Sequence, residues 1–201
     1  MLAAAACARP VPAPPEHSAT ERYFRETPSL APLTRLAMGA TLDTLRRLRP
    51  AAVAAPYVGL HEEIAGDTVR YWFAAGTPRS LIERVTPSYA PPSGSQPLLA
   101  IDAWTAFPSD SVARRAFADR VATLARSGPV RCVIVRFTMV PSKAVVLEVD
   151  GLTLGALLTA ERSTPSVGGA HRSPAVVRSF AAHRLDALLP SSVPRDSTSC
   201  A

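Results

Sequence analysis

The sequence has few of the residues that form covalent links or bind metals. Its three cysteines, Cys7, Cys132 and Cys200, lie far apart and include no Cys-x-x-Cys pair, so neither a disulfide framework nor a structural zinc site is expected. This pattern predicts a protein of a reducing compartment, the cytoplasm. Lysine is almost absent: Lys143 is the only one, and arginine supplies the rest of the 22 basic residues and the formal net charge of +6.

Long apolar runs are also missing. None approaches the roughly 20 residues that a membrane helix needs. Residues 1–19 form an Ala/Pro-rich tail, which we expect to be disordered. This tail contains Arg9 and has no acidic residue before Glu16, so the alternative is a transit peptide and an organelle matrix as the compartment. Its prolines suit an amphipathic helix poorly, which favours the plain tail.

No complete cofactor or catalytic motif is present. The chain lacks the GxxxxGK[ST] and GxGxxG phosphate loops and the GxSxG nucleophile turn. The triplet that starts at His61 begins like the HExxH motif of zinc proteases, but the second histidine position is Ala65, and the segment has the pattern of a strand. We therefore expect no cofactor and no metal site.

The remaining candidates for chemistry are weak. Asp102, Glu148 and Asp150 could converge at strand ends, but only if the predicted topology places them there. Cys132 lies in an apolar strand, where packing is far more common than a nucleophilic role. We predict no catalytic residue, and a non-enzyme is favoured over an enzyme.

Hydrophobic patterning predicts an α+β fold. Strands are expected at residues 57–64, 69–74, 98–104, 130–140 and 144–149, and helices at residues 33–49, 77–85, 110–126 and 174–189. Residues 20–28 alternate loosely, which predicts an edge strand. The pair Gly66–Asp67 predicts a hairpin between residues 57–64 and 69–74, turns are expected at residues 141–143 and at Asp150–Gly151, and residues 87–97 would form a connecting loop. The run 130–140 is apolar on both faces, which predicts a central strand.

This order of elements predicts a mixed, mostly antiparallel sheet with helices packed on one face. Its two β-α-β-like halves suggest a ferredoxin-like arrangement. Residues 20–190 would form a single domain, followed by a disordered tail at residues 191–201.

Three functions are compatible with these features. The absence of a catalytic constellation beside a well-patterned core favours a non-enzymatic protein-interaction or accessory module of a larger assembly. The arginine excess suggests nucleic-acid binding as the alternative, with Arg70, Trp72, Arg114 and Arg115 as the candidate contacts. Scattered arginines and core aromatics would explain the same residues without a ligand. An imported organelle protein of unknown activity is the third possibility.

One stretch resembles a known family. Residues 67–91 (DTVRYWFAAGTPRSLIERVTPSYAP) resemble the N-terminal, non-motor region of VirB4-like conjugative transfer ATPases, in which a short helix and a tyrosine-proline end follow an aromatic strand. Residues 21–33 (ERYFRETPSLAPL) extend the likeness, which then covers residues 20–140. The chain has no Walker motif, so the resemblance implies an accessory domain of a DNA-transfer apparatus that contacts a protein partner. It transfers no functional residues.

Overall fold

The computed structural model describes residues 18–55, 58–73, 94–137, 140–160, 162–166, 169–183 and 195–197. The large sheet is formed by β1 (Val53–Ala55), β2 (Val58–Ile64), β3 (Asp67–Phe73), β4 (Leu98–Phe107), β5 (Arg131–Phe137), β6 (Val140–Val149), β7 (Leu152–Thr159), β10 (Ala175–Ala182) and β11 (Arg195–Ser197). Its nine strands follow the order β1-β2-β3-β4-β10-β7-β6-β5-β11, and each pair is antiparallel. A separate two-stranded sheet pairs β8 (Arg162–Ser166) with β9 (Gly169–Ser173).

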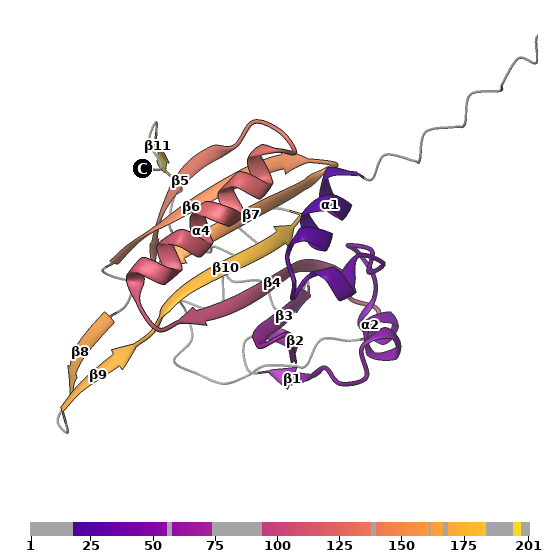
Figure 1. Ribbon diagram of the computed structural model, residues 1–201. Helices are drawn as coiled ribbons and strands as arrows, with labels where there is room; N and C mark the ends of the chain where they lie inside the picture. Colours follow the sequence, from indigo (N-terminus) through magenta and orange to yellow (C-terminus); the bar gives the residue numbers. More distant parts are fainter. Residues whose placement is uncertain are drawn as a thin grey trace, which may run out of the picture.

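The long helix α4 (Asp110–Ala125) lies across one face of the large sheet (Figure 1). Ser109 caps it, because its hydroxyl accepts a hydrogen bond from the Val112 N–H. Ala113, Phe117 and Leu124 are buried against the sheet, as the helical spacing predicts. The predicted α+β class and the placement of the helices on one face are confirmed.

The first helix, α1 (Ala19–Glu26), occupies the region where the sequence predicts an edge strand, and that prediction is wrong. Ser18 caps the helix by accepting from the Glu21 N–H at 3.1 Å. Glu21 and Arg25 then form an i,i+4 ion pair, and Tyr23 and Phe24 are buried side by side. These local signals outweigh the loose alternation of the same residues.

The predicted helix at residues 33–49 forms only in part. A short 3-10 turn, η1 (Ala31–Leu33), is followed by irregular chain, and α2 spans Leu42–Leu48. Gly39 adopts a φ of 87°, which is incompatible with a helix interior. Thr41 then starts α2, because its hydroxyl accepts from the Thr44 N–H at 3.3 Å.

The hairpin of β2 and β3 confirms the sequence prediction. Its two-residue turn is Ala65–Gly66, one position before the predicted pair, and both residues have positive φ, at 53° and 84°. This backbone geometry matches the twist of a tight antiparallel hairpin. A second tight turn at Asp150–Gly151, also predicted, joins β6 to β7.

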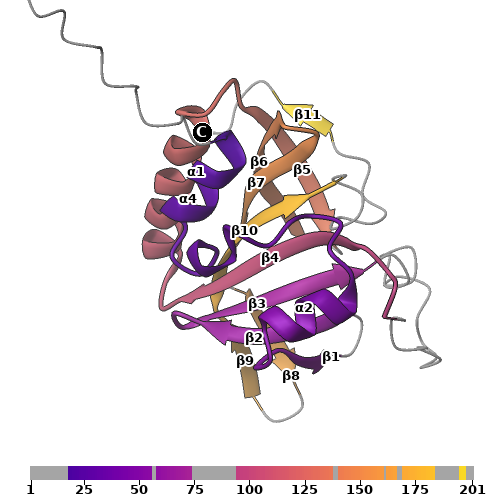
Figure 2. The same ribbon diagram turned by 90° about the vertical axis from the view of Figure 1, so that its right-hand side faces the viewer.

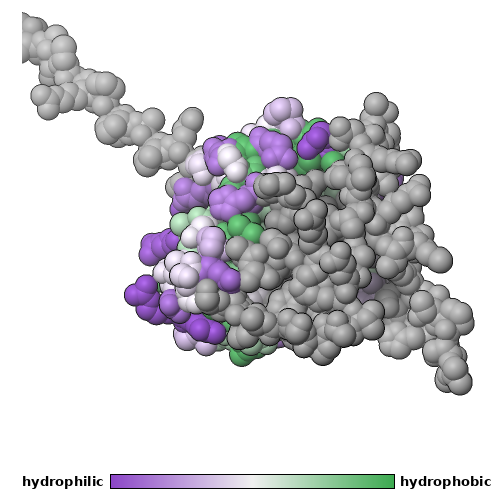
Figure 3. Space-filling view, turned by 180° about the vertical axis from the view of Figure 1, so that it is seen from behind, coloured by the Kyte–Doolittle hydropathy of each residue, from purple (hydrophilic) through white to green (hydrophobic). Residues whose placement is uncertain are grey.

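Buried apolar side chains line both faces of the sheet. The helix face, which α1 and α4 cover, holds the larger cluster, to which Leu42 and Leu45 of α2 also belong. In Figure 2, α1 and α4 lie to the left of the sheet, and α2 lies in front of β3. The second face is the opposite one, and its cluster is Trp72, Ala100, Val133, Ala144, Val146, Leu157, Phe180 and Ala182. Figure 3 views the molecule from that side, and its coloured surface is mostly hydrophilic with small separate hydrophobic patches.

Three predictions about the sheet need correction. The sequence predicts β5 at its centre, but β5 lies eighth in the order, between β6 and β11. The sequence of β5 is apolar on both faces because each face of this sheet holds a hydrophobic cluster. Val133 belongs to the second-face cluster. The central strand is β10, in the region where the sequence predicts a helix. A ferredoxin-like domain follows the order β-α-β-β-α-β. This sheet differs from it, because it has nine strands and one helix, α4, between β4 and β5.

Some predictions concern residues that the structure does not describe. The short helix at residues 77–85 and most of the connecting loop at residues 87–97 lie outside the described residues. The same holds for nearly all of the tail at residues 1–19 and for most of the tail at residues 191–201. The predicted turn at residues 141–143 is instead part of β6.

Candidate functional site

The most unusual polar cluster lies on the second face, where β3, β4 and β10 run side by side. Their register places Arg70 opposite Asp102 and Trp104 opposite Arg178. Trp72 lies two positions along β3 from Arg70 and therefore shares its face. Three neighbouring strands thus bring two indoles, two guanidinium groups and one carboxylate together.

Asp102 lies at the centre of this cluster and is fully buried. Its Oδ1 accepts from Trp72 Nε1 at 2.6 Å, and its Oδ2 accepts from Trp104 Nε1. Arg178 donates twice to the same Oδ2, from Nε at 2.9 Å and from Nη2 at 2.6 Å. Oδ1 therefore has one N–H donor and Oδ2 has three, so the carboxylate is well hydrogen-bonded by its own chain.

Both arginines of the cluster also contact the Trp104 ring. The guanidinium carbon of Arg70 lies 3.9 Å from the ring centroid, and that of Arg178 lies 4.6 Å from it. Cation–π attraction favours both contacts. Burial lowers the pKa of Arg70; the Asp102 charge opposes that shift, and the Arg178 charge adds to it.

A second buried network lies on the helix face. Glu62 accepts from Arg49 Nε at 2.8 Å and from Arg49 Nη2 at 2.7 Å, and the Tyr71 hydroxyl donates to the same carboxylate at 2.5 Å. Burial alone would raise the pKa of Glu62, but the hydrogen bonds from Arg49 and Tyr71 outweigh it and lower that pKa. Burial and the bond to Glu62 raise the pKa of the Tyr71 hydroxyl. This network ties the end of α2 to β2 and β3.

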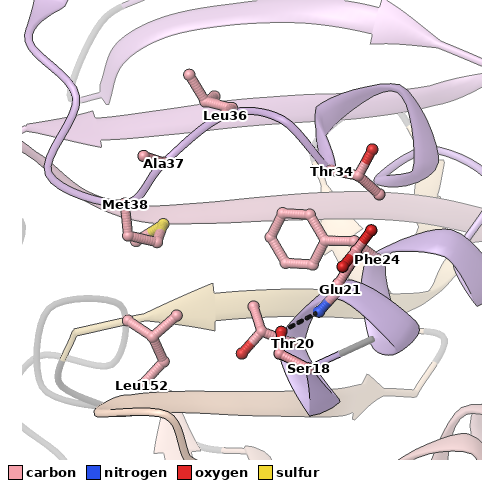
Figure 4. A pocket seen from close by; sticks show the side chains of 9 residues that line it. All are labelled: Ser18, Thr20, Glu21, Phe24, Thr34, Leu36, Ala37, Met38 and Leu152. Atoms are coloured by element: carbon pink, nitrogen blue, oxygen red, sulfur yellow. Dashed lines mark hydrogen bonds between the residues drawn. The ribbon is translucent and has the colours of Figure 1, made fainter. Parts of the chain in front are cut away.

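A shallow pocket of about 260 Å³ lies between α1, the chain after η1 and the start of β7 (Figure 4). Phe24, Met38 and Leu152 supply much of its wall. Its polar groups have local partners: Ser18 caps α1, and Thr34 Oγ1 donates to the Ala31 carbonyl at 3.2 Å. The pocket therefore has few polar groups that are free to bind a ligand.

The four predicted nucleic-acid contacts do not form one surface. Arg70 and Trp72 lie on the second face, whereas Arg114 and Arg115 are exposed on α4, which covers the helix face. Trp72 is buried, and its indole N–H is bound to Asp102. Its ring is therefore not available for stacking with bases.

The other sequence candidates are separated as well. Asp102 is held by Trp72, Trp104 and Arg178, whereas Glu148 accepts from Thr153 Oγ1 and Asp150 accepts from Thr20 Oγ1. Among the described residues, no group of three or more histidine, cysteine or acidic side chains could hold a metal ion. No helix in the described part of the chain is long and apolar enough to span a membrane.

Cys132 corrects a sequence prediction. It is buried, as expected, but it is disulfide-bonded. The other two cysteines of the chain, Cys7 and Cys200, lie outside the described residues. The prediction that no disulfide forms was wrong, because cysteine spacing in sequence says little about distance in a folded sheet. Disulfides persist mainly in oxidising environments, so the main argument for a reducing compartment is lost.

Sequence reasoning missed both buried networks. Asp102 stands alone in the apolar run Leu98–Phe107, and such an isolated acid in a strand is a signal for a buried, paired carboxylate. The sequence does not identify its partner Arg178, because the apolar spacing of residues 174–189 predicts a helix. Comparison with protein-family models, curated proteins and solved structures finds no match to this chain.

Proposed function

We propose that this protein is a non-enzymatic interaction module that works in a larger assembly. The two most deeply buried carboxylates, Asp102 and Glu62, are each bound by cationic and neutral donors from their own chain. Carboxylates that are hydrogen-bonded in this way stabilise the fold and are not free to act as an acid, a base or a nucleophile. Among the described residues, these two carboxylates therefore serve the fold, which supports a role in recognition over one in catalysis.

The observation that carries the proposal is an apolar pair at one end of the sheet. Leu48, the last residue of α2, is 55% exposed, and Val53, the first residue of β1, is 54% exposed. The turn between them is closed by a hydrogen bond from the Ala52 N–H to the Arg49 carbonyl at 3.1 Å. Large apolar side chains that are exposed together often mark a contact with another protein.

The chemistry of the partner follows from the edge beside this pair. β1 ends the strand order, so one side of it has no strand partner among the described residues. An extended peptide can add to such an edge through backbone hydrogen bonds. Arg46 and Arg47 in the last turn of α2 are exposed beside Leu48. We infer an extended, acidic segment with apolar side chains as the partner.

Photo-crosslinking in the native cell tests this proposal. A crosslinking amino acid at position 53 should trap one main partner, and the same group at Val112, an exposed valine on α4, should not. The partner segment should bind the double variant Leu48→Ser/Val53→Ser about thirtyfold more weakly than the parent, the effect of losing one binding hot spot. Equal crosslinking at both positions would contradict the proposal.

Two finer points remain predictions. The resemblance to VirB4-like ATPases predicts that the assembly is a DNA-transfer apparatus. The net charge of +6 and the exposed pair Arg114–Arg115 favour nucleic-acid binding as a second candidate. Filter binding at several salt concentrations tests the latter, because affinity from phosphate contacts falls steeply as salt rises. No binding even at about 50 mM salt would remove this candidate.

A further inference from the structure

We propose that Arg70 binds an oxyanion group of a ligand, a carboxylate or a phosphate, beside Trp104 on the second face of the sheet. This site is separate from the partner edge at α2 and β1 and does not depend on the proposed function. The inference begins with the charge of the cluster. Arg70 and Arg178 carry two positive charges and Asp102 carries one negative charge, so the group is left with one positive charge in excess.

Within the described residues, the contacts of Asp102 are with side chains other than Arg70. Its two oxygens already accept from Trp72, Trp104 and twice from Arg178. Oδ1 thus has one donor and Oδ2 has three, and none of these donors belongs to Arg70. Arg178 therefore has a counter-charge in contact, and Arg70 has none among the residues that the structure describes.

Arg70 has no other partner within the part of the chain that the structure describes. Its guanidinium stacks on Trp104, and it makes no hydrogen bond or ion pair there. Glu63 also attracts Arg70 electrostatically, but this exposed carboxylate accepts instead from Thr68 Oγ1 at 2.8 Å. A stacked guanidinium keeps its in-plane N–H groups free for a ligand.

The surroundings favour an oxyanion as that ligand. Arg70 and Trp104 are both partly exposed, so a small group can reach the guanidinium from solvent. Arginine presents paired donors that match the two oxygens of a carboxylate or a phosphate. Burial and the nearby Arg178 charge both lower the pKa of Arg70, and an anion in contact would reverse that shift. An oxyanion would thus relieve the unbalanced charge.

The chain contains its own reporter for this site. It has two tryptophans, Trp72 and Trp104, and both donate to Asp102. Intrinsic tryptophan fluorescence therefore reports on this cluster alone. Titration with inorganic phosphate and, separately, with succinate, each against sodium chloride at matched ionic strength, should give a saturable change. A response to phosphate alone or to succinate alone identifies the oxyanion class, and a response to both supports a general oxyanion site.

Three variants complete the test. Arg70→Gln should weaken binding about tenfold or more, the loss expected for a charge-assisted hydrogen bond. Arg70→Lys keeps the charge and should keep part of the response, and Arg114→Gln on α4 should respond like the parent. Far-UV circular dichroism verifies that each variant is folded. The proposal is overturned if the parent shows no saturable change with either anion, or if folded Arg70→Gln responds like the parent.

Discussion

Arg178 binds Asp102 diagonally across β10 and β4, with both of its donating nitrogens within 2.9 Å of one carboxylate oxygen. The strand register places Arg178 directly opposite Trp104, so Arg178 reaches Asp102 two residues away along β4. The side chains are 7% and 0% exposed, respectively. Removing two charges from water is costly, and the two partners offset that cost only when both are present.

Loss of one partner should therefore be more harmful than loss of both. We expect Asp102→Asn to lower the free energy of unfolding by about 3–5 kcal/mol, because it leaves the Arg178 charge buried without a counter-charge. The double variant Asp102→Leu/Arg178→Met should be more stable than Asp102→Asn. Urea denaturation of the purified variants measures both effects.

Asp119→Asn provides the matched control, since Asp119 is exposed on α4. Its cost should be at most about 0.5 kcal/mol. If Asp102→Asn and Asp119→Asn lose similar stability, the buried pair does not contribute as argued here.

The lowered pKa of Glu62 makes stability depend on pH. A carboxyl whose folded pKa lies below its unfolded value, about 4.3 for glutamate, contributes its full stability above that unfolded value. The contribution is lost as the pH falls through the folded pKa. We expect the parent to lose stability steadily in urea melts taken from pH 5 downward.

Glu62→Gln should remove this part of the pH dependence, because the amide does not titrate, and should already be less stable than the parent at pH 7. Glu63→Gln serves as the control: Glu63 is the exposed neighbour on the same strand, and its variant should keep the slope of the parent. An unchanged slope in Glu62→Gln would show that other groups cause the acid sensitivity.

Local signals in the sequence were sufficient for part of this fold. The hairpin of β2 and β3 and the helix α4 are marked by strict alternation, a turn signal, a serine cap and an apolar stripe. Each of these signals acts within a few residues along the chain. The hairpin and the helix α4 can therefore be predicted from the local sequence, and both were.

The central strand β10 shows why the rest was not predictable. Val177 and Ala181 belong to the helix-face cluster, whereas Phe180 belongs to the second-face cluster. A strand that is buried on both faces loses its alternation, and its apolar residues then also fit a helical spacing. The candidate site could not be predicted for the same reason, because Asp102 and Arg178 come into contact only through the pairing of β4 with β10.

Gly155 on β7 tests the packing around this central strand. A Cβ atom there would lie 2.3 Å from the Phe180 ring and 2.9 Å from the Val145 carbonyl oxygen. We expect Gly155→Ala to cost about 1–3 kcal/mol in urea denaturation, the usual penalty for overpacking a core. Gly151 in the turn before β7 is the control: it has open space around it, and asparagine tolerates its φ of 72°. Gly151→Asn should be close to neutral, and equal losses in both variants would contradict the crowding at Gly155.

The disulfide of Cys132 should join it to Cys200. β11 pairs with β5 so that Ser197 lies opposite Cys132, and Cys200 follows Ser197 by only three residues. Cys7, by contrast, precedes the first described residue, Ser18, by eleven positions. Peptide mapping under non-reducing conditions should therefore recover a Cys132–Cys200 pair.

The same bond should stabilise the edge of the sheet at β11. Cys200→Ser should lower the free energy of unfolding by about 2–4 kcal/mol, the usual contribution of a disulfide, and a reducing agent should destabilise the parent to a similar extent. Cys7→Ser should change neither the map nor the stability, so it is the matched control. Recovery of a Cys7–Cys132 peptide, or of free Cys132 in protein kept from reductants, would contradict this pairing and leave β11 held to β5 by backbone hydrogen bonds alone.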